Sequence, residues 1–185
     1  MKIVAIIPAR GGSKRLKKKN IYPIWDKPMI YWAIKACKES KYSIEPWVST
    51  EDTEIAEVSL QCGARVVNRK HSLAGDKIYK QAAVRDAARM IISLEGPQDI
   101  YISLQANSPQ IQAKHLDNAI DIFLQNKRDE IFSVDENLMQ NAAFRIFKGG
   151  YVFQEDLSTN CGAFVCPLED VHTIHDVERI EDIGA

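Results

Sequence analysis

The apolar positions in the first two thirds of the chain follow two alternating patterns. Residues 3–7 form an unbroken apolar run, rich in isoleucine, that is typical of a strand covered on both faces. Shorter strand-like runs follow at residues 47–48, 65–67, 100–104 and 131–134. Between them, apolar side chains recur at the spacing of one helix face, within residues 28–37, 55–62, 83–94 and 116–123. Strand and helix patterns therefore alternate.

Four strand–helix units in succession predict an α/β fold with an open, doubly wound, mostly parallel sheet. Ligands of such sheets bind beyond the carboxyl ends of the strands, so the loops after strands are where chemistry is expected. The last third differs. Residues 144–147, a glycine pair and residues 151–153 predict a hairpin, and residues 163–165 predict a further strand. No repeat or linker divides the chain, so we expect one domain over residues 1–185.

Composition narrows the class of protein. The 185 residues are 45% hydrophobic and 26% charged, which is enough apolar material for one substantial core. The formal net charge of −1 argues against a protein that coats nucleic acid. No stretch approaches the ~20 apolar residues of a membrane span, and the first ten residues do not resemble a cleaved leader. We therefore expect a cytoplasmic protein with neither nucleic acid nor membrane as a partner.

The loop over residues 10–19 follows the first strand directly and combines two glycines with five basic residues among positions 14–19. Glycine lets the backbone approach a ligand closely, and Arg and Lys supply the charge that a triphosphate needs. The loop matches neither the Walker pattern nor the dinucleotide pattern Gly-x-Gly-x-x-Gly. It indicates phosphate binding at the end of the first strand. A solvated basic turn, or a basic patch that touches nucleic acid, is the alternative.

This loop begins a series of blocks that resembles the acylneuraminate cytidylyltransferases, which make CMP-activated sialic acids and related nine-carbon keto sugar acids. Relatives of that family activate the eight-carbon acid Kdo. The matching blocks follow in order over residues 3–109: Ile7-Pro8-Ala9-Arg10-Gly11-Gly12-Ser13-Lys14, Lys19-Asn20-Ile21, Lys27-Pro28-Met29-Ile30-Tyr31-Trp32, Val48-Ser49-Thr50-Glu51-Asp52, Leu73-Ala74-Gly75-Asp76 and Leu104-Gln105-Ala106-Asn107-Ser108-Pro109.

The resemblance implies a glycosyltransferase-A-like nucleotidyltransferase fold in which CTP and a sugar acid meet at the strand ends. It implies catalytic roles for Arg10, Lys19 and Gln105. The nucleotide-binding residues that it implies are Ala9, Arg10, Gly11, Gly12, Ser13, Lys19, Arg69 and Asp76. The substrate-binding residues that it implies are Gln105, Asn107 and Ser108. Other interpretations remain, since Arg69 and Asp76 could form an ordinary exposed pair and Gln105 could satisfy backbone groups at a strand end.

The family's C-terminal acidic motif implies bound Mg²⁺. Here Asp170, Thr173 and Asp176 fit that motif, whereas His172 stands where the family has a second carboxylate. Mg²⁺ prefers oxygen ligands, so an imidazole at this position weakens Mg²⁺ or shifts the preference toward Mn²⁺. We expect Asp170 and His172 to be the metal ligands. The alternative interpretation is that Thr173 caps a helix and that His172 only forms a hydrogen bond with the backbone.

Two further differences from the family concern the acceptor and the oligomeric state. Asn107 replaces a carboxylate of the Kdo branch and resembles the sialic acid branch. The arm that completes the family's dimer is shortened around residues 140–160, so a monomer or weak homodimer is expected. We expect transfer of CMP from CTP to a sialic-type or related keto sugar acid. The alternatives are a nucleotidyltransferase with another acceptor and a non-catalytic nucleotide-binding protein.

Overall fold

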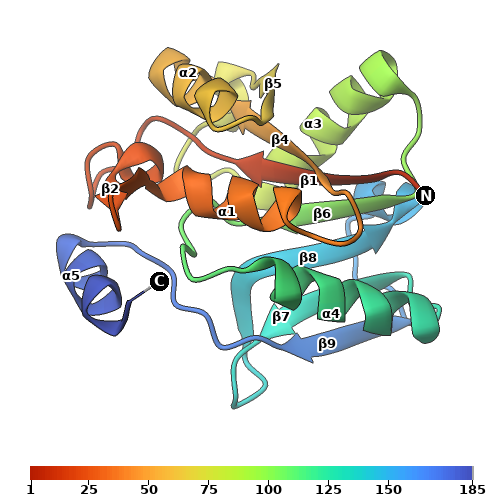
Figure 1. The fold of residues 1–185 in the computed structure, drawn as a ribbon. Coiled ribbons are helices and arrows are strands. Elements are labelled where there is room, and N and C mark those ends of the chain that lie inside the picture. The colour runs from red at the N-terminus through yellow and green to blue at the C-terminus, as the bar shows by residue number, and fades with distance from the viewer. Residues whose placement is uncertain (185) are drawn as a thin grey trace.

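The computed structural model describes residues 1–184, built around a seven-stranded sheet with helices on both faces (Figure 1). The strands lie in the order β5-β4-β1-β6-β8-β7-β9. Only β8 runs antiparallel to its neighbours; every other pairing is parallel. The bounds of the strands are β1 Ile3–Pro8, β4 Glu45–Thr50, β5 Arg65–Asn68, β6 Ile100–Leu104, β7 Glu130–Val134, β8 Gln140–Lys148 and β9 Cys161–Val165.

The centre of the sheet is β1, which pairs with β4 on one side and β6 on the other. Its alternate side chains enter different cores: Ile7 packs beneath one helical layer and Ile6 beneath the other. A strand covered on both faces needs an unbroken apolar run, which is what residues 3–7 supply. The prediction of a buried parallel first strand is confirmed.

Helices cover the sheet unequally. One face packs against α1 (Met29–Lys38), α2 (Thr53–Gln61) and α4 (Ala113–Gln125), whereas α3 (Lys80–Glu95) covers the other. Their ends follow local chemistry: Asp52 caps α2 by accepting the Ile55 N–H at 3.0 Å, and Gly63 takes a left-handed φ of 84° just beyond that helix. The predicted doubly wound α/β architecture is confirmed.

The last helix, α5 (Ile174–Ile183), stands apart from the sheet beside the short hairpin of β2 (Pro23–Ile24) and β3 (Lys27–Pro28) (Figure 1). Val177 and Ile180 of α5 share a small apolar cluster with Leu16 and Ile24. The chain therefore returns at its C-terminal end to the basic loop that follows β1. No helix among residues 1–184 is long and apolar enough to cross a membrane.

The predicted hairpin over residues 144–153 is wrong in its second half. Residues Gly149–Phe153 form the short 3-10 helix η3, and the hairpin partner of β8 is β7. Because β8 already pairs with β6 on one edge and β7 on the other, no edge remains for residues 151–153. Val152 instead packs against the core beneath α3. The predicted strand at residues 163–165 is confirmed as part of β9, parallel to β7.

Candidate functional site

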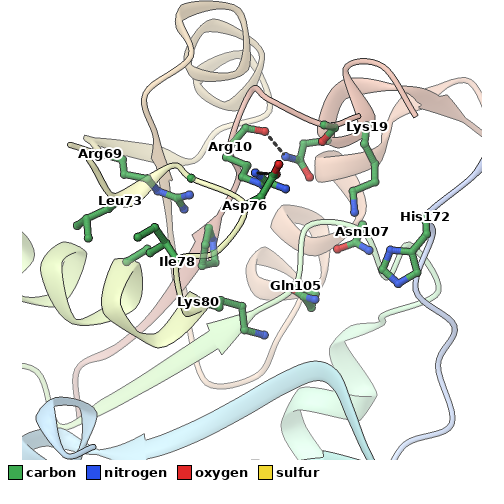
Figure 2. A pocket seen from close by; sticks show the side chains of 15 residues that line it. Arg10, Lys19, Arg69, Leu73, Asp76, Ile78, Lys80, Gln105, Asn107 and His172 are labelled. Atoms are coloured by element: carbon green, nitrogen blue, oxygen red, sulfur yellow. Dashed lines mark hydrogen bonds and ion pairs between the residues drawn. The ribbon is translucent and has the colours of Figure 1, made fainter. Parts of the chain in front are cut away.

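A polar cleft of about 270 Å³ opens beyond the carboxyl ends of β1 and β6 (Figure 2). Segments far apart in the sequence meet there: the basic loop, the end of β5, the first turn of α3, the end of β6 and the stretch before α5. Its lining residues are Pro8, Arg10, Ser13, Lys19, Asn20, Arg69, Leu73, Gly75, Asp76, Ile78, Lys80, Ala83, Gln105, Asn107 and His172. Eight of them were predicted from the sequence.

Arg10 enters the cleft directly after β1, held from behind by the Asn20 amide, which donates to its carbonyl at 2.9 Å. The guanidinium pairs with Asp76 and also reaches the Ala74 carbonyl at 3.4 Å. Asp76 pairs with Lys14 as well, at 2.5 Å. Hydrogen bonds from Lys14 and Arg10 lower the pKa of this exposed carboxyl to about 2. In the unliganded protein, Asp76 therefore neutralises part of the loop's charge.

Lys19 begins the 3-10 helix η1 (Lys19–Ile21) and points into the cleft (Figure 2). Burial lowers the pKa of its amine; the charge of Asp170 opposes that shift, while Arg15 and Arg10 add to it. Among residues 1–184, no carboxylate oxygen lies within 4 Å of this amine. A half-buried cation without a close counter-ion gains free energy from an anionic ligand.

Arg69 follows β5 and is only 5% exposed. Its Nε donates to the Ser49 hydroxyl at 3.4 Å, and its Nη2 has no hydrogen-bond partner among the described residues. Burial lowers the pKa of the guanidinium, with the charge of Glu51 opposing the shift. Arg69 is not paired with Asp76, so the alternative of an exposed ion pair between them is wrong. The structure brings both residues to one cleft.

The residues after β6 divide between two roles. Gln105 donates its backbone N–H to Ala143 at 2.9 Å and exposes its side chain in the cleft. Asn107 lines the cleft too, but its side-chain amide donates to the Val171 carbonyl at 2.9 Å. The Ser108 hydroxyl donates to Asp170 and is fully buried. Asn107 and Ser108 thus attach the C-terminal stretch to the sheet, a role that the sequence did not indicate.

The expected metal ligands lie on that attached stretch. The His172 ring lines the cleft, with Nδ1 3.4 Å from Arg15 Nη2. Burial lowers the pKa of His172, Lys19 and Arg15 lower it further, and Asp170 opposes them. Asp170 is not among the lining residues, and its carboxylate accepts a hydrogen bond from the Ser108 hydroxyl. Within residues 1–184, no group of three His, Cys, Asp or Glu side chains is placed to hold a metal ion.

Asp176 is fully committed to the start of α5. Its Oδ2 accepts the backbone N–H groups of His172 at 2.9 Å and Thr173 at 2.8 Å, and the Thr173 hydroxyl at 2.9 Å. Burial favours a higher pKa, but these hydrogen bonds hold the pKa of Asp176 at about 2. Thr173 is the N-cap of α5, as one interpretation of the sequence predicted.

Four of the residues predicted for ligand binding do not line the cleft, namely Ala9, Gly11, Gly12 and Ser108. The Ala9 N–H donates to the Ser49 carbonyl at 3.0 Å, and the Gly11 N–H donates to Glu51 Oε1 at 2.8 Å. A Cβ on Gly11 would overlap the Asp52 side chain, so this glycine is required by close packing between two loops. The cleft is thus lined mainly by side chains rather than by backbone N–H groups of the basic loop.

Lys80 is the lining residue of most consequence that the sequence interpretation missed. It begins α3, and burial lowers the pKa of its amine to about 8, with Asp170 opposing and Arg145 adding to the shift. The spacing of apolar residues predicted this helix only from Ala83 onward. Lys80 lies one turn earlier, before the apolar face of the helix starts. The one available signal was its place just after the Leu73–Asp76 block of the resemblance.

The cation-lined cleft lies at the strand ends of an open α/β sheet, which is where ligands of the doubly wound class of proteins bind. The family model described as cytidylyltransferase matches residues 4–160. The chain therefore belongs to the cytidylyltransferase family. It is 34% identical over 161 residues to N-acylneuraminate cytidylyltransferase A of Danio rerio, which covers 85% of this chain and 36% of the relative.

The chain is also 36% identical over 137 residues to the pseudaminic acid cytidylyltransferase of Campylobacter jejuni, covering 74% of this chain and 59% of that protein. It thus spans between about a third and three fifths of the length of these relatives. Among solved structures, CMP:2-keto-3-deoxy-manno-octonic acid synthetase complexed with CTP aligns over 99% of this chain and 98% of its own, with a TM-score of 0.79 and 17% identity. That likeness confirms the nucleotidyltransferase fold.

Proposed function

We propose that this protein transfers CMP from CTP to a sialic-type or related keto sugar acid, releasing pyrophosphate. The observation that supports this most directly is the gathering of Arg10, Lys19 and Arg69 around one cleft within a cytidylyltransferase fold. The relatives named above act on N-acylneuraminate and pseudaminic acid, which are nine-carbon keto sugar acids.

The reaction needs alignment and charge neutralisation rather than a covalent nucleophile. A hydroxyl oxygen of the acceptor forms a bond to the α-phosphorus of CTP, the bond from that phosphorus to the bridging β-oxygen breaks, and the hydroxyl loses its proton. Arg10 and Lys19 hold the triphosphate and neutralise the departing pyrophosphate. For this, the triphosphate displaces Asp76 from Arg10. Gln105, which lines the same cleft just after β6, binds the acceptor through its amide.

The donor set fits a magnesium ion shared with the nucleotide. Mg²⁺ in such enzymes takes one or two carboxylates, and water and phosphate oxygens complete its octahedron. Asp170 supplies a carboxylate close enough to influence the pKa of Lys19, and His172 lines the cleft. Asp176 does not contribute, because its carboxylate is bonded to the N-terminal turn of α5. When bound, the ion would polarise the α-phosphoryl group and ease the loss of the acceptor proton.

The test is a pyrophosphate-release assay with each of four nucleoside triphosphates, Mg²⁺ or Mn²⁺, and a panel of keto sugar acids. We expect turnover with CTP and at least one nine-carbon acid. CTP binding without turnover on any acceptor would favour a non-catalytic nucleotide-binding protein, and turnover on a different class of acceptor would favour another nucleotidyltransferase. Equal thermal stabilisation by all four nucleotides would contradict the assignment to cytidine.

A further inference from the structure

A second cleft, of about 240 Å³, adjoins the nucleotide cleft on the α3 face of the sheet. It lies between the first turn of α3 and the neighbouring strands β6 and β8, and its lining residues are Tyr79, Lys80, Gln81, Ser103, Gln140, Asn141, Ala142, Phe144 and Arg145. Lys80 lines both clefts. Figure 2 shows its side chain extending from α3 toward the end of β6, where Gln105 lies. A ligand in the second cleft would therefore meet the nucleotide at Lys80.

The charges in this second cleft are unbalanced. Arg145 is already neutralised, since its Nε donates to Glu130 at 2.9 Å and its Nη2 pairs with the same carboxylate. The Lys80 amine donates one hydrogen bond, to the Ala142 carbonyl at 3.4 Å. In the described part of the chain, no carboxylate oxygen lies within 4 Å of this amine. With a pKa of about 8, its amine is mostly protonated at neutral pH. The cleft thus holds one cation without a counter-ion.

Two further features point to an anionic, hydroxyl-bearing ligand. Ser103 is 1% exposed, and its hydroxyl has no hydrogen-bond partner among the described residues although it lines the cleft. A buried hydroxyl without a partner costs free energy until something bonds it. In addition, the N-terminus of α3 has no side-chain cap and no acidic residue in its first turn, so its positive end is not neutralised locally.

We propose that this second cleft is the acceptor subsite and that Lys80 binds the acceptor's carboxylate. This inference rests on the proposed function, because it names the group that recognises the acid in that reaction. Lys80 stands between the two substrates, so it fixes the acid beside the α-phosphate and makes a negative charge on the acceptor a condition of binding. Ser103 then bonds a hydroxyl or carboxylate oxygen of the same molecule.

The experiment compares acids with their uncharged esters. N-acetylneuraminate, pseudaminate and the methyl ester of each are titrated calorimetrically into the protein saturated with CMP, which occupies the nucleotide cleft without reaction. We expect the wild-type protein to bind at least one acid about 10- to 100-fold more tightly than its ester, the range of a charge-assisted hydrogen bond. In Lys80→Met that preference should fall to about 2-fold or less, and Lys80→Arg should retain most of it.

Matched controls separate the possible failures. Lys77→Met removes an exposed lysine from the loop that precedes α3 and should leave the preference for the acid unchanged. Lys80→Met should keep its melting temperature and lose much less affinity for CTP than for the acid. An unchanged preference for the acid in Lys80→Met, CTP binding that weakens as much as acid binding, or a wild-type protein that binds CTP but neither acid would overturn the proposal. Failure of the wild type to bind CTP would instead contradict the proposed function itself.

Discussion

Asn107 and Val171 join the end of the central sheet to the C-terminal stretch through two hydrogen bonds. The Val171 N–H donates to the Asn107 carbonyl at 2.8 Å, and the Asn107 side-chain amide donates back to the Val171 carbonyl at 2.9 Å. Val171 is fully buried in the cluster that holds α5 against the basic loop. This joint places Asp170 and His172 next to the cleft, so it links the stability of the C-terminal stretch to the chemistry.

Asn107→Ala removes the side-chain half of that joint and leaves the Val171 carbonyl without its donor. We expect a loss of about 1–2 kcal/mol in the free energy of unfolding, measured by denaturant titration. Metal-dependent turnover should fall more steeply than the affinity for CTP. The reason is that the expected metal ligands Asp170 and His172 shift, whereas the basic loop keeps its position. Asn118→Ala, on the exposed face of α4, is the control and should not destabilise the protein. A loss of CTP affinity equal to the loss of turnover would contradict this assignment.

Arg10→Ala removes the cation that stands closest to the end of β1. We expect kcat/KM for CTP to fall about 30- to 150-fold, equivalent to roughly 2–3 kcal/mol of transition-state stabilisation. Lys17→Ala, an exposed change in the same loop, should alter kcat/KM by less than about 3-fold. Steady-state pyrophosphate release measures both variants. Similar losses in the two would mean that the loop acts only through its general positive field.

Asp76→Asn tests whether this carboxylate competes with the triphosphate for Arg10 and Lys14. Because the pair is exposed, its loss should leave the melting temperature nearly unchanged. CTP should bind about 2- to 5-fold more tightly in calorimetric titration, since two cations are released for the phosphates. Weaker binding would show instead that Asp76 contacts the nucleotide itself, as the resemblance implies.

We expect metal-supported activity to depend on pH through His172, because only a neutral imidazole can bind a metal ion. Burial and the charge of Lys19 lower its pKa, so the neutral ring persists below pH 6.5. Activity should therefore hold at pH 6.5 and fall as the pH drops through the lowered pKa, with Mn²⁺ supporting turnover better than Mg²⁺. His172→Asp should raise Mg²⁺-dependent activity. If His172→Ala leaves both the pH profile and the metal preference intact, the ring is not a ligand.

The segment in place of the family's dimer arm folds onto its own sheet. Val152 is buried beneath α3, Gln81 donates to its carbonyl at 3.5 Å, and the Ser158 N–H donates to Glu130. Val152 and Ser158 therefore anchor this segment to its own subunit, which opposes its exchange with a second copy. We expect light scattering to give a monomer at micromolar concentration. A tight dimer at that concentration, with cross-links between residues 150–160 of different subunits, would contradict this expectation.

The sequence by itself determined the elements whose signals are local. The apolar run at residues 3–7, the stop at Gly63 and the Thr173 cap each depend on neighbours within a few positions, and the structure confirms all three. The position of Arg10 and Lys19 in the cleft was also predictable, because a basic glycine loop after a buried strand must lie at the ligand edge of a parallel sheet.

Only the tertiary structure decided which side chains are free to act. Asn107 was expected to bind the acceptor, yet its side-chain amide donates to the carbonyl of Val171, a residue of the C-terminal stretch. Lys80 has no motif of its own; its significance depends on burial and on the distance to carboxylates that come from other parts of the chain. Sequence spacing fixes which residues share an element, whereas the partners and solvation of a side chain depend on contacts between segments more than sixty residues apart.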